Sequence, residues 1–346
     1  MNDDAGIPRG LVLVTGATGL LGANLVRRLL ADGHAVRTLV LPGDPARALV
    51  GLDVERVVGD LRDADAVARA VDGCARVFHV AALPPKITRS PAREREIWDV
   101  NVVGTRHVMR AALAAGVARV VLTGSFSAVG FDPDDPARAS DETLPYYPFV
   151  DWLPYARTKI LAEHEALRAF VDGLDVVIAI ATGIVGPHDY VPSPQGKMIC
   201  AFAAGRLRAY IPGGSEFVST RDIVEGHVLA MERGRAGHRY LFSTAHLGID
   251  ELMNTLAELS GRPRARRLPG GLVRALSAIT YARPVARLLP ERAQRVTPGM
   301  LHILAMRRHA DCSKAARELG YVPGDIKVAL AEAHEFFARE GMIGQA

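Results

Sequence analysis

A glycine-rich turn near the start of the chain constrains its fold more than any other feature. The apolar run Leu11–Val14 leads into residues 15–22 (TGATGLLG), and apolar residues then recur at helical spacing up to Ala31. Glycine suits positions with positive φ and positions where the backbone must closely approach a ligand or a neighbouring element. A strand, this turn and a helix therefore predict the first unit of a parallel sheet that holds a pyrophosphate.

The spacing of the turn is GxxGxxG rather than the commoner GxGxxG, and a purely structural turn is the alternative interpretation. Free N–H groups and the positive end of the helix dipole meet at a helix N-terminus, so we expect dinucleotide phosphates to bind there. The residues expected at this cofactor site are Gly16, Thr18, Gly19, Leu20, Leu21 and Gly22.

The first half of the chain alternates short β-branched runs with longer amphipathic segments. Strands are predicted at Leu11–Val14, Ala35–Leu41, Val54–Val58, Arg76–Val80, Val117–Leu122 and Val176–Ile180. Helices are predicted at Leu20–Ala31, Ala64–Val71, Glu94–Ala115 and Tyr155–Phe170. This alternation indicates βαβ units, and right-handed crossovers then give an α/β fold with a doubly wound parallel Rossmann sheet.

After residues 186–187 (Gly-Pro) the regular alternation of strands and helices ends. Helices are predicted beyond this point at Arg221–Glu232, Ile249–Leu259 and Ile326–Arg339. We predict a dinucleotide-binding domain at 8–186, to which 221–245 return, and a smaller C-terminal substrate-binding cap in most of 187–346. The proline-rich segment 131–152 is predicted to be a loop that borders the catalytic cleft, with an ordinary surface loop as the alternative.

Composition excludes several classes of protein. The 346 residues are 49% hydrophobic and 23% charged, which rules out a disordered or fibrous chain. An excess of 42 basic over 38 acidic residues is too small and too dispersed for nucleic-acid binding. No apolar run reaches the ~20 residues of a membrane span. We expect a soluble, cytoplasmic protein that acts on a small molecule.

The three cysteines, Cys74, Cys200 and Cys312, lie far apart without metal-site spacing, so neither a disulfide framework nor a metal is expected. The arginine-rich residues 261–267 and the amphipathic run 272–289 suggest contact with a membrane surface. We favour two simpler interpretations of them, a solvated charge cluster and a helix that closes the substrate pocket.

The ends of the second and third predicted strands bear on the cofactor. Asp60 follows the third strand, where a carboxylate can accept from an adenine amino group, although it is also a candidate N-cap. A carboxylate after the second strand would bind the ribose of NAD, and an arginine there would bind the phosphate of NADP. Leu41 ends that strand. Arg37 and Arg47 are candidates to contact a phosphate of the cofactor, with a solvated surface charge as the alternative for each. The choice between NAD and NADP stays open.

Tyr155 and Lys159 lie four residues apart and therefore share one face of a predicted helix. A nearby ammonium stabilises a phenolate, which favours proton transfer by the tyrosine. Ser125 follows the fifth predicted strand, at the edge of the sheet where such folds bind ligands, and its hydroxyl can hydrogen-bond a reacting carbonyl. The three residues predict hydride-transfer chemistry.

Together these motifs resemble the extended short-chain dehydrogenase/reductase family over nearly the whole chain. Beside the glycine turn, the resemblance rests on residues 60–61, 80–82, 101–105 (NVVGT), Ser125 and 155–159 (YARTK). It is strongest to the branch that holds dihydroflavonol-reductase-like, 3β-hydroxysteroid-dehydrogenase-like and hopanoid-associated epimerase-like proteins.

The resemblance implies roles for particular residues. Tyr155 would be the general acid/base, Lys159 its partner and a clamp on the nicotinamide ribose, Ser125 the group that orients the reacting oxygen, and Asn101 a support of the catalytic helix. Further residues would contact NAD(P): Leu61, Val80, Ala81, Ala82 and Thr123. A homodimer is also implied.

Four departures limit what the resemblance carries over. Leu41 stands where related reductases that use NADPH often have arginine, and Gly124 replaces a serine near the expected nicotinamide. Residues 181–183 (ATG) replace a common Asn-Pro or Arg-Pro. Ser215 stands where nucleotide-sugar epimerases commonly have a diphosphate-binding arginine, which counts against a nucleotide-sugar substrate.

The leading hypothesis is an NAD(P)-dependent oxidoreductase that interconverts a secondary alcohol and a ketone, or an aldehyde, on a fairly apolar substrate. The cap aromatics Phe202, Tyr210 and Phe217 favour it, although each of them is also a core candidate. An epimerase or dehydratase acting on a sugar and retaining its NAD is the alternative, and a dinucleotide-binding protein without catalysis is a third interpretation.

Overall fold

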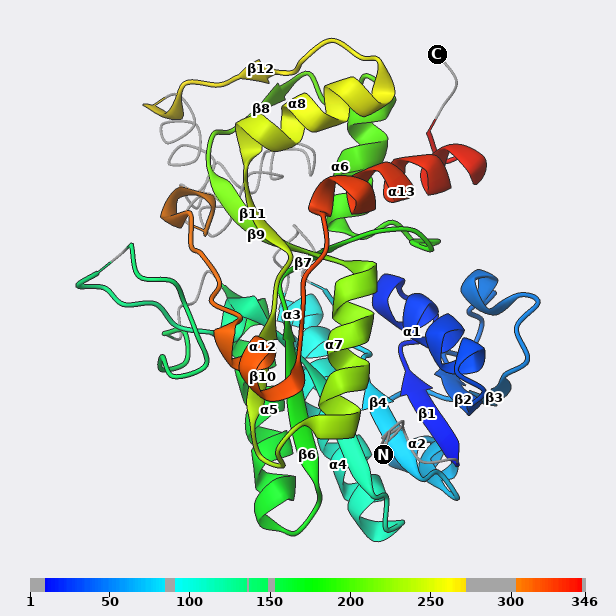
Figure 1. Cartoon of the computed structure of the whole chain (residues 1–346). Helices are drawn as coiled ribbons and strands as arrows, with labels where there is room; N and C mark the ends of the chain where they lie inside the picture. The colour runs from blue at the N-terminus through cyan, green and yellow to red at the C-terminus, as the bar shows by residue number, and fades with distance from the viewer. Residues whose placement is uncertain (1–9, 85–90, 136, 149–152, 272–302, 344–346) are drawn as a thin grey trace, which may run out of the picture.

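The computed structural model describes residues 10–84, 91–135, 137–148, 153–271 and 303–343. Seven parallel strands form the central sheet in the order β10-β6-β5-β4-β1-β2-β3 (Figure 1). They are β1 (Leu11–Thr15), β2 (Ala35–Val40), β3 (Glu55–Val58), β4 (Arg76–His79), β5 (Arg119–Ser125), β6 (Val176–Ala181) and β10 (Arg239–Phe242). The order reverses between β1 and β4, which confirms the predicted doubly wound Rossmann sheet.

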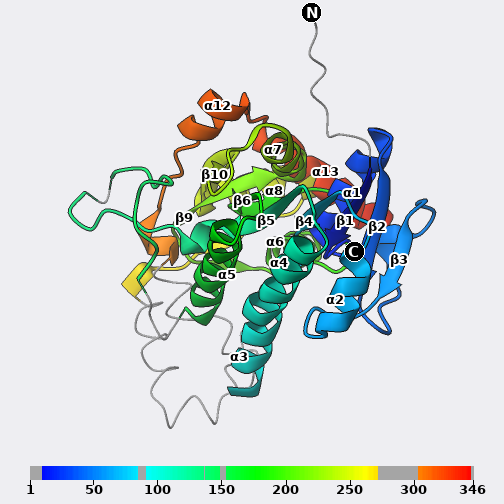
Figure 2. The same ribbon diagram turned by 90° about the horizontal axis from the view of Figure 1, so that it is seen from below.

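Helices cover both faces of this sheet, as Figure 2 shows. Helices α1 (Leu20–Ala31) and α7 (Thr220–Arg233) share one apolar core with the strands. Helices α2 (Ala64–Val71), α4 (Gly104–Ala114) and α5 (Pro154–Val171) share the core of the opposite face. Burial on both faces explains why strands such as β6 are apolar at every position rather than alternating.

The single helix predicted at Glu94–Ala115 is wrong. The segment forms α3 (Pro91–Trp98), a π-helical turn at Asp99–Val103 and then α4. The hydroxyl of Thr105 donates to the carbonyl of Asn101 at 2.7 Å. Gly104 lies so close to Leu61 that a Cβ would approach the leucine Cβ to 2.8 Å. Widened turns of this kind often occur at functional sites.

The second half contains strands that periodicity did not reveal, because they are short. Strands β7 (Gly183–Val185), β9 (Gly214–Ser219) and β11 (Ala245–Gly248) form one small sheet, and β8 (Ala209–Tyr210) pairs with β12 (Arg266–Arg267). Helices α6 (Pro194–Ala203), α8 (Ile249–Ser260), α12 (Ser313–Leu319) and α13 (Ile326–Arg339) complete the described elements, with short 3₁₀ turns at Arg47–Leu49 and Phe126–Ala128.

We call the small sheets together with α6, α8 and α13 the cap (Figure 1). Phe202 and Phe217 are 2% and 4% exposed and lie in the apolar core of the cap. They therefore hold the cap together and give no evidence of an apolar pocket. The amphipathic run 272–289 lies outside the described residues.

Strand β10 follows the first cap elements, β7, α6, β8 and β9, in sequence, yet it pairs with β6 at the edge of the central sheet. Helix α7 precedes it and packs on β5 and β6. The chain thus leaves the central sheet after β6, forms much of the cap, and returns. The division of the chain into domains at residues 186 and 187 stays a prediction.

Candidate active site

The glycine turn between β1 and α1 forms a cradle in which side chains do not fit. Gly16 has a φ of 71°, and a Cβ there would lie 2.7 Å from the backbone of Ala81. A Cβ on Gly22 would lie 2.1 Å from the carbonyl oxygen of Gly16. A Cβ on Gly19 would lie 3.4 Å from the carbonyl oxygen of Gly16, its nearest neighbour, so this position is more open.

No side chain caps the N-terminus of α1, and its first turn carries no acid. Its N–H groups are therefore available to an anion at the carboxyl edge of the sheet, beside the point where strand order reverses. This cradle fits the pyrophosphate of a dinucleotide, and Leu20 and Leu21 at the start of α1 lie beside it.

A hydrogen-bonded chain links this cradle to the π-helical turn. The amide of Ala81 donates to the hydroxyl of Thr15 at 3.3 Å, and that hydroxyl lies 2.8 Å from Nδ1 of His79. Nε2 of His79 lies 3.0 Å from the hydroxyl of Thr105, which donates onward to Asn101. Burial lowers the pKa of His79 to about 3, so the imidazole is neutral and carries its proton on Nε2.

Residues 60–61 follow β3 at the same edge of the sheet. The carboxylate of Asp60 accepts from the side chain of Arg62 at 2.6 Å, and this bond lowers the pKa of the aspartate. Asp63 caps α2, so the N-cap alternative for Asp60 is wrong. Leu61 is 6% exposed and packs beneath Gly104.

The structure does not bring Arg37 to the cofactor edge. Its guanidinium donates to the carbonyl oxygens of Ala70 and Asp72 at the C-terminal end of α2, and it pairs with Glu55. These groups lie toward the amino edge of the sheet, opposite the glycine turn. The expected contact between Arg37 and a phosphate therefore has no support here.

Sequence reasoning missed Asp44, which reaches the glycine turn from the loop after β2. Its carboxylate accepts from the hydroxyl of Thr18 at 2.9 Å and from the amide of Ala46 at 2.8 Å. The aspartate lies four residues beyond the strand end, so inspection of the strand end alone did not reveal it.

The three residues expected to react with substrate lie together at the carboxyl ends of the central strands. Tyr155, on the first turn of α5, lies beside Ser125, which ends β5. Burial raises the pKa of Tyr155 to about 12, and the nearby Ser125 hydroxyl opposes this effect. The hydroxyl of Ser125 also lies 2.9 Å from that of Ser127.

Lys159 is 4% exposed and lies one helical turn after Tyr155 on α5. Its ammonium donates to the carbonyl oxygen of Thr123 at 2.6 Å. Burial lowers the pKa of Lys159 to about 8, and the carboxylate of Glu163 opposes this effect. The lysine thus titrates close to neutral pH.

Thr123 is itself held on its other side. Its hydroxyl lies 2.8 Å from Nε2 of His227, whose Nδ1 bonds the carbonyl oxygen of Ile223 at 2.7 Å. Burial lowers the pKa of His227 to about 4, so the ring is neutral and accepts from the threonine. Helix α7 therefore fixes the backbone that receives the Lys159 ammonium.

Asn101 joins the loop after β4 to the catalytic helix. Its side chain accepts from the amide of Leu83 at 2.7 Å and donates to the carbonyl oxygen of the same residue at 3.1 Å. Its amide nitrogen also lies 3.2 Å from the hydroxyl of Thr158, which bonds the carbonyl oxygen of Tyr155.

Sequence reasoning also missed a buried charge cluster behind the active site. Glu163 is fully buried, and its carboxylate lies 3.0 Å from the guanidinium of Arg239 on β10. That guanidinium lies over the ring of Tyr146, 4.5 Å from its centre, and the tyrosine side chain lies near Glu163. A Cβ on Gly124 would approach Glu163 to 2.9 Å, so this glycine makes room for the carboxylate rather than for a nicotinamide.

Glu163 follows Lys159 by four residues, so a helical spacing rule could have signalled it. Arg239 and Tyr146 come from distant segments, and nothing local in the sequence connects them to the helix.

Another residue that sequence reasoning missed, Arg308, joins a segment next to the cap to the loop after β5. Its guanidinium donates to the carbonyl oxygens of Val129 and Gly130 at 2.8 and 2.6 Å. It also lies 4.4 Å from the centre of the Phe126 ring. Burial lowers the pKa of Arg308 to about 10, so the group stays charged at neutral pH.

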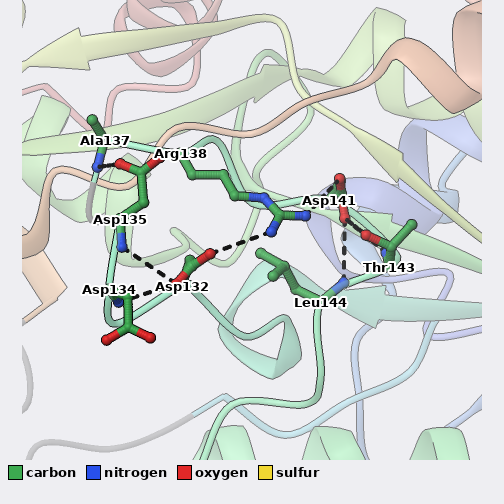
Figure 3. Close-up of polar contacts among 8 residues, drawn as sticks. All are labelled: Asp132, Asp134, Asp135, Ala137, Arg138, Asp141, Thr143 and Leu144. Carbon is green, nitrogen blue, oxygen red and sulfur yellow. Dashed lines mark hydrogen bonds and ion pairs between the residues drawn. The ribbon is translucent and has the colours of Figure 1, made fainter.

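The loop predicted at 131–152 is described except at 136 and 149–152, and Figure 3 shows the acidic part of it. The carboxylate of Asp132 accepts from two amides of its own turn and from Arg138. Farther along, Glu142 accepts from the amide of Leu241 in β10 at 2.6 Å. These acids therefore fold the loop and attach it to the sheet.

Among the described residues, no group of three or more His, Cys, Asp or Glu side chains is arranged to bind a metal. Within the same residues, no helix combines the length and the apolar character needed to cross a bilayer.

Comparisons with known proteins bear on the family to which this chain belongs. A family model described as "NAD dependent epimerase/dehydratase family" matches residues 12–242. The chain is 42% identical to sterol demethylase protein B of Methylococcus capsulatus, over 96% of this chain and 99% of that one. It is 30% identical to 3 beta-hydroxysteroid dehydrogenase/Delta 5-->4-isomerase of Mycobacterium tuberculosis, over 91% and 86%.

Among solved structures, the chain resembles the dTDP-glucose 4,6-dehydratase DesIV of Streptomyces venezuelae, whose crystal structure contains NAD. The TM-score is 0.76 at 25% identity, over 96% of this chain and 98% of that one. The glycine cradle, the sheet order and these matches lead to one conclusion: this chain is an enzyme of the NAD-dependent epimerase/dehydratase family, within the extended short-chain dehydrogenases/reductases.

Proposed function

We propose that this enzyme interconverts a secondary alcohol and a ketone on an apolar, sterol-like substrate. The observation that carries the proposal is the position of Tyr155, beside Ser125 and one helical turn from the buried Lys159. A phenol in this position can exchange a proton with a substrate oxygen that Ser125 also contacts.

Each residue then has a distinct task. Tyr155 takes the hydroxyl proton when the alcohol is oxidised and returns it in the reverse direction. Ser125 orients the reacting oxygen, and the Lys159 ammonium favours the phenolate form of Tyr155. NAD(P), held at the glycine cradle, would supply hydride acceptance or donation. Asn101 positions α5 through Thr158.

The proposed substrate class rests on two kinds of support. The two relatives compared above are named for sterol and steroid chemistry. In addition, two described positions that could hold a sugar diphosphate do not offer a free cation. Ser215 on β9 occupies the place of the usual arginine, and Arg308 binds the carbonyl oxygens of Val129 and Gly130.

The test is oxidation of a panel of 3-hydroxysterols with NAD⁺ and NADP⁺, followed by NAD(P)H absorbance and product mass. On a substrate found in this way, we expect Tyr155→Phe to lower kcat by about 10²- to 10⁴-fold, because the proton acceptor is gone. Tyr210→Phe is the matched control, since the hydroxyl of Tyr210 bonds Asp250 in the cap. Near-normal turnover by Tyr155→Phe would refute the mechanism.

A sugar epimerase or dehydratase that retains its NAD is the second candidate, favoured by the family description and by the likeness to DesIV. Mass spectrometry of nucleotide released from the denatured protein separates the two. Stoichiometric NAD would favour the epimerase or dehydratase, whereas an empty site would favour a cofactor that exchanges at each turnover. The homodimer and the cytoplasmic location stay predictions.

A further inference from the structure

We propose that an arginine patch on the cap docks this enzyme on an anionic membrane surface. The patch consists of Arg206, Arg208, Arg264, Arg266 and Arg267, all of them exposed. The choice of a membrane as partner rests on the proposed function, because a sterol-like substrate partitions into bilayers. The charge cluster itself is independent of that function.

The pairing of β8 with β12 brings the patch together. These strands run parallel, with Arg266 opposite Ala209. The amide of Arg266 donates to the carbonyl oxygen of Arg208 at 2.8 Å, so arginines almost sixty residues apart in sequence become neighbours. Figure 1 shows both strands on the cap, at the end of the molecule away from the central sheet.

A further arginine helps to fix the geometry of the patch. Arg262 donates through Nε to the carbonyl oxygen of Ala203 at the end of α6. This bond holds the start of the second arginine segment against the first. The arginines are therefore presented by paired backbone, not by an isolated tail.

The patch has few counter-charges. Within the described part of the chain, its one ion pair joins Arg267 to Asp250 at 3.6 Å. That aspartate also accepts from the hydroxyl of Tyr210 at 2.6 Å. Glu258, on the last turns of α8, is the nearest other acid in sequence. Five exposed guanidinium groups thus retain most of their positive charge for an external partner.

An anionic bilayer matches this arrangement better than a nucleic acid does. Guanidinium groups bind phosphate through paired N–H donors, and a lipid surface offers phosphates in a plane. Single-stranded nucleic acids are instead held by aromatic side chains on which bases stack. The aromatic residue of these two strands, Tyr210, is engaged with Asp250 through its hydroxyl.

The test is co-sedimentation of the full-length protein with vesicles, without substrate or added cofactor. One set of vesicles contains phosphatidylcholine alone, and the other contains equal parts of phosphatidylcholine and phosphatidylglycerol. We expect binding to the anionic vesicles at low salt, at least tenfold weaker binding to the neutral ones, and loss of binding at high salt because exposed charges are screened.

Arg208→Glu/Arg266→Glu should weaken binding to the anionic vesicles at least tenfold, and the milder Arg208→Gln/Arg266→Gln should weaken it less. Arg69→Glu/Arg221→Glu is the control, with the same change of net charge at exposed positions on α2 and α7. Thermal unfolding verifies that each variant is folded, and the Gln pair replaces the Glu pair if the latter does not fold.

Three results would overturn the inference: no binding to anionic vesicles, equal losses in the patch and control variants, or binding to a DNA oligonucleotide as tight as to the vesicles. Because substrate is absent, the outcome is separate from the proposed function. Sterol oxidation in detergent without vesicle binding would reject the docking surface alone, and vesicle binding without sterol turnover would reject the proposed substrate alone.

Discussion

At the residue scale, the acid–base properties of the site depend on burial and on a few named partners. Burial of Lys159 on α5 lowers the pKa of its ammonium to about 8. The carboxylate of Glu163, one helical turn later, opposes this effect because it favours the charged form of the lysine. Glu163 in turn faces Arg239 at 3.0 Å. The carboxylate is too deep to touch a substrate, so we regard it as a positioning residue that acts through Lys159.

Glu163→Gln should move the pH profile of turnover. Loss of the carboxylate lowers the pKa of Lys159 further, so the ammonium deprotonates at lower pH and the alkaline limb of kcat shifts to lower pH. Measurement of kcat from pH 6 to 10 tests this. Glu165→Gln, on the same helix but paired with Arg106, is the control. A merely structural role would reduce kcat at every pH without moving the limb.

Asp44 predicts a preference for NAD over NADP. A hydrogen bond from the hydroxyl of Thr18 holds the carboxylate of Asp44 beside the glycine turn. A negative charge at this place repels the extra phosphate of NADP. Asp44→Asn should lower the ratio of the Kd for NADP to the Kd for NAD about tenfold. Asp53→Asn, an exposed change nearby in sequence, should leave the ratio unaltered. Tighter binding of NADP by the unmodified enzyme would contradict the prediction.

At the scale of elements, the catalytic helix is held by partners from several segments. Asn101 contacts it from the π-helical turn, and His227 on α7 fixes the Thr123 backbone that receives Lys159. The turn itself bonds to the loop after β4 through Leu83. The site is therefore assembled where strands and helices meet, not within one motif.

Gly22→Ala should abolish cofactor binding or unfold the turn, because a Cβ would lie 2.1 Å from the carbonyl oxygen of Gly16. Equilibrium binding of NAD⁺ and thermal unfolding measure the two effects. Gly248→Ala is the matched control, since its Cβ would meet no atom within 4 Å. Equal behaviour of the two variants would show that the close packing of the turn is not required.

Local patterns predicted the central sheet and its glycine turn well, because each strand and helix is long enough to show its own periodicity. They failed where tertiary contacts decide the structure. The π-helical turn depends on the packing of Gly104 against Leu61, which no local rule reveals. Arg37 looked like a phosphate ligand by position, but its side chain is drawn to carbonyl oxygens at the end of α2.

The same limit applies to the site. The spacing of Tyr155 and Lys159 predicted a shared helical face, and both residues lie on α5. Arg239, which faces Glu163, comes from a segment about eighty residues after Lys159. Arg308, which binds the loop after β5, comes from a segment about one hundred and fifty residues after Lys159. Their positions depend on how the chain returns to the sheet, which a single sequence does not show.

At the scale of the whole molecule, Arg308 joins the segment after residue 303 to the loop after β5, and the main-chain bonds between Ser140 and residues 309 and 311 run beside it. The partly buried Arg308 and these main-chain bonds thereby connect the cap side and the catalytic side of the molecule. This connection borders Ser125 through the Phe126 ring.

Arg308→Met should therefore destabilise the fold by about 2 kcal/mol, since two carbonyl oxygens lose a charged donor. Urea denaturation measures this change. Arg307→Met removes an exposed neighbour with no carbonyl partner among the described residues, and it should cost far less. If both variants are equally stable, the carbonyl contacts do not contribute as argued.

The return of the chain from the cap to β10 also sets an order for synthesis on the ribosome. Arg239, the cation beside the buried Glu163, emerges only after the first part of the cap, β7 to β9, has been translated. A nascent chain that ends before β10 has an exposed β6 edge and an uncompensated carboxylate beneath its catalytic lysine. Completion of the catalytic centre therefore waits for the first part of the cap, so a chain that ends before β10 lacks a complete catalytic centre.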